Sequence, residues 1–270
     1  MATPPPTRES GGIVVVVRVT RTRPEPWSPA ELAVLLQAVE PLSGPTPPDG
    51  SVAVRDRVVE ITALHDDESS PAHGALVAAG RLAAGLEIAM RSLGWEPRRE
   101  VADDPGVTPL ITVRAARRRA AIPLALARHR IDRRLREGTV YGRGRPELAQ
   151  VVDVAHGTST TRAWAVLANG PSHDGAPSWR TPGTPVPEAT DVALPWRRDP
   201  VLAVCTHGNE VADQVTGGVA AHRAVVTAAL RGLRADVHTD PLRTAAARAA
   251  WGRRLDARGG HVQALVHLHP

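Results

Sequence analysis

Residues 80–95 read Gly80-Arg-Leu-Ala-Ala-Gly-Leu-Glu-Ile-Ala-Met-Arg-Ser-Leu-Gly94-Trp95. A second stretch, Gly218-Val-Ala-Ala-His-Arg-Ala-Val-Val-Thr-Ala-Ala-Leu-Arg-Gly232-Leu233, has the same layout. In both, a helix-length run of small and apolar residues lies between two glycines, and each glycine recurs 138 positions later. An offset shared by two landmarks indicates an internal repeat.

Strand-like apolar runs frame both stretches in the same order. They occupy residues 58–61 and 110–113 around the first, and residues 201–204 and 264–268 around the second, so the repeat covers 56–113 and 199–268. Few polar positions interrupt either helix, chiefly His222 and Arg223 in the second. Both helices should therefore be buried on several sides and pack closely on each other. We predict an α+β fold in which two repeated halves of one chain form a pseudo-dimer.

The repeat divides the chain into four regions. They are an N-terminal extension at 1–27, a first half at 28–136, an irregular proline-rich lid or linker at 137–198, and a second half at 199–270. Within the extension, the β-branched run 12–20 favours a strand. No partner strand is evident for it, and an unpaired edge of this kind favours self-association into a homodimer.

The first half begins with a helix-start signal. Ser28 is a capping residue, Pro29 suits the first helical position, and Glu31 completes a capping box. The helix should end near Val39, because prolines and glycines in residues 41–50 predict a loop.

The charge pattern argues against a nucleic-acid partner. The net charge is only +5 over 270 residues, and most arginines are interspersed with acids, with no aromatic platform among them. A basic helix is predicted over 116–136, interrupted at Pro123. Its arginine clusters at 114–119 and 128–136 form either a solvated face or a phosphate site.

The single cysteine and the apolar runs limit the class of protein further. Cys205 excludes an intramolecular disulfide, and its apolar neighbours favour a buried thiol over a catalytic one. The apolar run 13–17 is too short for a signal peptide, and no run reaches the length of a membrane span. We therefore expect a cytoplasmic protein with no membrane partner.

Several motifs occur in an order that resembles the Acg-type nitroreductases, a family of the FMN-binding nitroreductase superfamily. The motifs are Leu93-Gly94-Trp95, His129-Arg130-Ile131-Asp132-Arg133-Arg134, Asp174-Gly175-Ala176-Pro177, Asp199-Pro200-Val201-Leu202-Ala203-Val204 and Gly260-His261-Val262-Gln263-Ala264-Leu265-Val266-His267-Leu268. The resemblance covers roughly residues 30–270. It implies a nitroreductase-like fold, FMN bound between the halves, NAD(P)H as reductant, and a small-molecule substrate such as a nitro compound, quinone or biosynthetic intermediate.

By the same resemblance, the cofactor-binding residues lie in two segments, and no catalytic residue is assigned because flavin supplies the redox chemistry. The cofactor-binding residues are Ser43, Gly44, Thr46, Arg128, Arg130 and Arg133. After their first helix, family members usually carry Ala-Pro-Ser-x-x-Asn-x-Gln-Pro-Trp, whereas this chain retains only Ser43 and Thr46 as polar equivalents. The alternative is therefore a degenerate, non-catalytic relative that stores flavin or binds another ligand.

Two histidines near the C-terminus have a spacing that a metal can use. His267 and His269 alternate on a predicted strand and so face the same side. No acidic or cysteine partner is near them in the sequence, which favours an ordinary surface strand. We expect no metal site.

Overall fold

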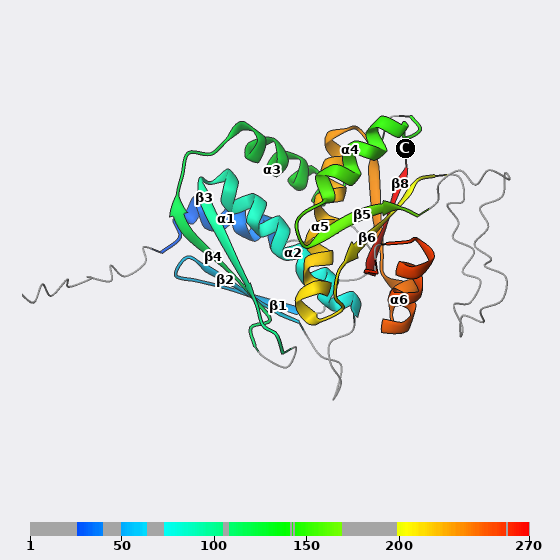
Figure 1. The fold of residues 1–270 in the computed structure, drawn as a ribbon. Helices are drawn as coiled ribbons and strands as arrows, with labels where there is room; N and C mark the ends of the chain where they lie inside the picture. The colour runs from blue at the N-terminus through cyan, green and yellow to red at the C-terminus, as the bar shows by residue number, and fades with distance from the viewer. Residues whose placement is uncertain are drawn as a thin grey trace, which may run out of the picture.

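The computed structural model describes residues 26–39, 50–63, 73–104, 108–140, 142, 144–168, 199–257 and 259–269. Its two antiparallel sheets lie on opposite sides of a central pair of long helices (Figure 1). The protein is therefore α+β, as predicted. The predicted strand at 12–20, the loop carrying Ser43, Gly44 and Thr46, and most of the proline-rich segment lie outside the described residues.

The two sheets have the same strand order. The first contains β1 (Gly50–Arg55), β2 (Val58–Ala63), β3 (Trp95–Val101) and β4 (Ile111–Arg118) in the order β1-β2-β4-β3. The second contains β5 (Ala163–Leu167), β6 (Val201–Thr206), β7 (Arg234–His238) and β8 (His261–His269) in the order β5-β6-β8-β7. In each sheet a long helix connects the second strand to the third, so the two sheets have the same connectivity.

Six α-helices complete the described fold. The two long ones are α2 (His73–Ser92) and α5 (Val211–Leu230), and the others are α1 (Pro29–Val39), α3 (Pro123–Arg136), α4 (Leu148–Thr158) and α6 (Ala245–Arg254), with a short 3-10 helix at Asp240–Leu242. Helix α2 packs on the first sheet and α5 on the second, and the two helices pack on each other. Among the described helices, none is both long and apolar enough to cross a membrane.

Helices α2 and α5 cross at Gly80 and Gly218 with their backbones in contact. A Cβ atom added to Gly80 would lie 2.1 Å from the carbonyl oxygen of Val215, and one added to Gly218 would lie 2.1 Å from that of Val77. Val215 follows Val77 by the same offset that separates the glycines, so the repeat relates the two contacts. Val77 packs into the core of the second sheet and Val215 into that of the first. The two cores therefore interlock.

The second pair of matched glycines ends the two long helices. Gly94 follows α2 with a φ of 79°, and Gly232 follows α5 with a φ of 75°. Residues with a side chain are strained in this left-handed region, whereas glycine adopts it freely. This backbone requirement explains why glycine recurs at both positions.

Local signals predicted some helix boundaries and not others. The capping box is confirmed, because the Ser28 hydroxyl and the Glu31 carboxylate exchange hydrogen bonds with each other's backbone amides. The predicted basic helix at 116–136 is wrong in its first residues. Ala116, Arg117 and Arg118 belong to β4, where Arg118 pairs with Trp95 of β3, and α3 begins only at Pro123. Pairing across the sheet overrides the local helical pattern there.

The region between the halves is more regular than its sequence indicated. Residues 148–158 form α4, which starts at a capping box between Glu147 and Gln150, and residues 163–167 form β5. Strand β5 pairs with β6 along its whole length, so it occupies the place in its sheet that β1 occupies in the first. An irregular lid at 137–198 is therefore wrong for the described part of this segment.

Candidate functional site

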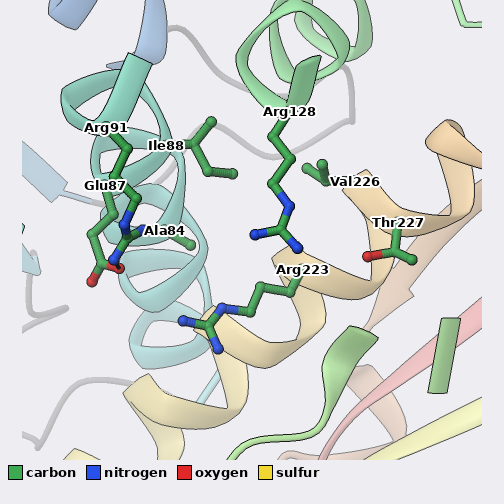
Figure 2. Close-up of a pocket in the computed structure, with 8 residues that line it drawn as sticks. All are labelled: Ala84, Glu87, Ile88, Arg91, Arg128, Arg223, Val226 and Thr227. Carbon is green, nitrogen blue, oxygen red and sulfur yellow. Dashed lines mark hydrogen bonds and ion pairs between the residues drawn. The ribbon is translucent and has the colours of Figure 1, made fainter. Parts of the chain in front are cut away.

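A hollow open to solvent lies where α3 meets the central helix pair. Its lining residues are Ala84, Glu87, Ile88 and Arg91 of α2, Arg128 of α3, and Arg223, Val226 and Thr227 of α5. Arg128 extends from α3 toward α5, and the Arg223 side chain extends from α5 toward the α2 side of the hollow (Figure 2). Three arginines around one glutamate give the hollow a cationic lining.

Helical periodicity explains how each helix contributes its polar lining. Glu87 and Arg91 lie one turn apart on α2, and Arg223 and Thr227 lie one turn apart on α5. The small side chain of Ala84 helps to leave the space open. The hollow is thus assembled by the packing of three helices, and no single segment contains it.

The carboxylate of the hollow is already neutralised by its neighbours. Glu87 accepts a hydrogen bond from Arg91 at 3.0 Å and another from Arg99 at 2.8 Å. Arg128 and Arg223, by contrast, make no ion pair with any residue that the structure describes. Arg128 is exposed and Arg223 is half-buried. The hollow therefore has two guanidinium groups available for an anion.

The electrostatics of Arg223 agree with this reading. Burial lowers the pKa of its guanidinium, Glu87 raises it, and the positive charges of Arg91, Arg99 and Arg128 lower it further. Arg223 is thus a partly desolvated cation in a positive environment. A bound anion would relieve that repulsion.

A buried ionic network beside the hollow attaches α3 to the central helices. Oδ1 of Asp132 lies 2.9 Å from Nε2 of His222 on α5, and Oδ2 of Asp132 accepts a hydrogen bond from Nε of Arg136 at 3.1 Å. The side chains of all three residues are at most 4% exposed. Gly85 of α2 leaves the space that the Arg136 guanidinium occupies, because a Cβ atom there would overlap it.

The network keeps one carboxylate ionised inside the protein. Burial alone would raise the pKa of Asp132, but the contact with His222 and the charge of Arg136 outweigh burial and hold it at about 2. Burial lowers the pKa of His222, whereas its contact with Asp132 acts in the opposite direction. Asp132 lies one turn after Arg128 on α3. The network therefore sets the position from which Arg128 enters the hollow.

The structure brings one of the six predicted cofactor residues into the hollow. Arg128 lines it, whereas Arg130 and Arg133 do not, and Arg133 instead pairs with Glu137 at 3.3 Å on the exposed face of α3. Ser43, Gly44 and Thr46 lie outside the described residues. Of the three arginines predicted on this helix, only Arg128 therefore lines the hollow.

Sequence reasoning missed Arg91 and Arg223 as lining residues. Arg223 was visible as an interruption of an otherwise apolar helix, but nothing in the sequence showed that Arg128 lies opposite it.

The single cysteine, Cys205, is buried as predicted. Its side chain is fully buried, and burial raises its thiol pKa to about 12, which disfavours a nucleophilic thiolate.

Comparison of the sequence with protein-family models and with curated proteins finds no match. Any functional assignment consequently depends on the ordered sequence motifs and on the geometry of the hollow.

Proposed function

We propose that this chain is a nitroreductase-like, FMN-dependent oxidoreductase in which the two halves form a pseudo-dimer and the arginine-lined hollow holds the phosphate of FMN. The motif order from Leu93 to the C-terminal strand supports the family. The shared strand order of the two sheets and the matched contacts of Gly80 and Gly218 support a duplicated architecture.

One observation carries the proposal. Arg128 and Arg223 line one hollow from two different helices, and neither forms an ion pair with a described residue, although Glu87 acts electrostatically on Arg223. Two positive charges that share a site repel each other unless an anion lies between them. The planar guanidinium group also matches the geometry of phosphate oxygens. The residues of the hollow therefore fit the phosphate end of the cofactor.

Each lining residue has a defined part in this arrangement. Arg223 supplies a partly desolvated charge from α5, and Arg128 supplies a second charge from the rim. The hydroxyl of Thr227, one turn after Arg223, is a further hydrogen-bond donor in the lining. Glu87 does not repel the phosphate strongly, because Arg91 and Arg99 already neutralise it. Bound FMN would accept hydride from NAD(P)H and transfer it to a small electrophile.

The direct test measures the binding of FMN to the full chain through the quenching of flavin fluorescence. Replacing Arg223 or Arg128 by alanine should weaken FMN binding about 10- to 100-fold, since a hydrogen bond to a charged group contributes roughly 1.5–3 kcal/mol. Riboflavin, which lacks the phosphate, should bind the variants and the parent protein equally. Arg130→Ala is the matched control, because it removes an arginine of α3 that does not line the hollow.

Two results would overturn the phosphate assignment. One is no FMN binding at flavin concentrations well above that of the protein, and the other is the same loss of affinity in Arg130→Ala as in Arg128→Ala. Oxidation of NAD(P)H in the presence of a quinone then tests turnover separately from binding.

A non-catalytic relative is the second candidate function, favoured by the composition of the hollow. Its eight lining residues include no aromatic side chain on which a flavin ring could stack. Inorganic phosphate that binds as tightly as FMN, through Arg128 and Arg223, would support a binding protein for a small anion. Tight FMN binding without NAD(P)H oxidation would indicate flavin storage.

A further inference from the structure

A cluster of imidazoles and carboxylates lies near the C-terminal end of β8 in the second sheet, and none of its residues lines the arginine-lined hollow. His267 and His269 of β8 stack with ring centroids 4.9 Å apart. Asp236 of β7 lies directly across from His267 in the strand pairing, and its Oδ2 is 2.8 Å from Nε2 of His269. The expectation that these histidines have no acidic partner nearby is therefore wrong, because strand pairing supplies one 31 residues upstream.

We propose that Asp236, His267 and His269 bind a divalent first-row transition metal ion, with Zn²⁺ as the leading candidate. One ligand atom from each side chain lies within 4.8 Å of the other two. Two imidazoles and a carboxylate form a ligand set that suits Zn²⁺ and related ions, whereas Mg²⁺ and Ca²⁺ prefer oxygen ligands alone.

Side-chain placement supports an accessible and partly preorganised site. The side chains of His267 and His269 are 12% and 19% exposed, which limits their freedom, whereas Asp236 is 57% exposed and leaves an entry path for the ion. Metal binding would require the three side chains to rotate so that their ligand atoms reach coordination distance.

Two neighbouring residues extend the cluster. Oδ2 of Asp199, just before β6, lies 3.5 Å from Nε2 of His267, and the ring of His238 on β7 is centred 6.4 Å from that of His267. Asp199 is thus placed either as a fourth ligand or as a partner that orients His267. Arg81 of α2 acts electrostatically on Asp236, but the two carboxylates leave the cluster negative when the imidazoles are neutral. An ion here would tie together the ends of β6, β7 and β8.

The test uses the full chain without a histidine tag, stripped with a chelator and dialysed against Zn²⁺. We expect one Zn²⁺ per chain and a rise in melting temperature with Zn²⁺. His269→Ala and Asp236→Asn should each weaken binding at least about tenfold and abolish that rise. Substitution of Co²⁺ should give visible absorption bands that both variants lose.

His156→Ala is the matched control, because His156 is an exposed histidine on α4 outside the cluster. It should bind Zn²⁺ as the parent protein does. Failure to bind Zn²⁺ stoichiometrically, or equal binding by His269→Ala, Asp236→Asn and His156→Ala, would overturn the metal site. Arg128→Ala should retain the metal, so this outcome is independent of the flavin proposal.

Discussion

The crossing of α2 and α5 predicts that Gly80→Ala destabilises the protein, although alanine is the better helix former. A Cβ atom at this position would lie 2.1 Å from the Val215 carbonyl oxygen and 3.1 Å from the Gly218 Cα. An unstrained carbon-to-oxygen contact is about 3.3 Å or longer, so the helices must separate by about 1 Å at the centre of the molecule. The obstructing atoms belong to the backbone, so no side-chain rotation relieves the overlap.

Two opposing effects set the size of the expected stability loss in Gly80→Ala. Alanine is favoured over glycine in a helix by up to about 1 kcal/mol, whereas overpacking a tight interior costs about 1–3 kcal/mol. A backbone overlap belongs at the upper end of that range, so we expect a net loss of about 2 kcal/mol. For a chain of this size that corresponds to a fall in melting temperature of about 4–8 °C.

Gly74→Ala is the matched control in the same helix. A Cβ atom there would lie 3.4 Å from the Thr239 hydroxyl, which is an ordinary contact, so its stability should be unchanged or slightly increased. Gly218→Ala should match Gly80→Ala, and the double variant should lose less than the sum because both substitutions open one gap. A Gly80→Ala variant that calorimetry finds as stable as the parent protein, or more stable, would contradict the predicted overlap.

Three further predictions test the buried network, the thiol and the repeat. Asp132→Asn should cost about 3–5 kcal/mol in urea unfolding, while the exposed control Glu137→Gln stays within about 0.5 kcal/mol. The pKa of Asp132 is about 2 in the folded protein and about 4 in the unfolded chain. Its ionised carboxylate therefore contributes fully to the free energy of unfolding above about pH 4, and this contribution is lost as the pH falls toward 2. Identical acid unfolding of the parent protein and Asp132→Asn would contradict this. Cys205 should not react with a thiol reagent in the native state and should react once in denaturant, and rapid native labelling would show that the thiol is not enclosed. Gly94→Ala and Gly232→Ala should both lose the roughly 1–2 kcal/mol of a left-handed residue, but Gly94→Ala should lose more, because its Cβ atom would also lie 2.5 Å from the Arg119 carbonyl oxygen; equal melting temperatures would refute that difference.

The residues of the candidate site could be noticed in the sequence, but their proximity could not be predicted from it. Arg128 was assigned through a family resemblance, and Arg223 was noticed as a break in an apolar helix, but the space between them exists only because α3 docks on α2 and α5. That docking depends on Asp132 and Arg136 of α3 and on His222 of α5, which lies far later in the chain. Asp236 and His269 likewise meet only through the pairing of β7 with β8.

The sequence by itself determined the repeat, the C-terminal ends of the two long helices and the class of the fold. These features are local or periodic: small residues along one helix, glycines at the helix ends, and apolar runs before and after. Only the tertiary structure decided that Gly80 and Gly218 touch, that residues 148–167 complete the second half, and that Arg128 faces Arg223. Contacts of this kind join residues far apart in the chain. Their strength depends on distance and burial, which the order of residues does not contain.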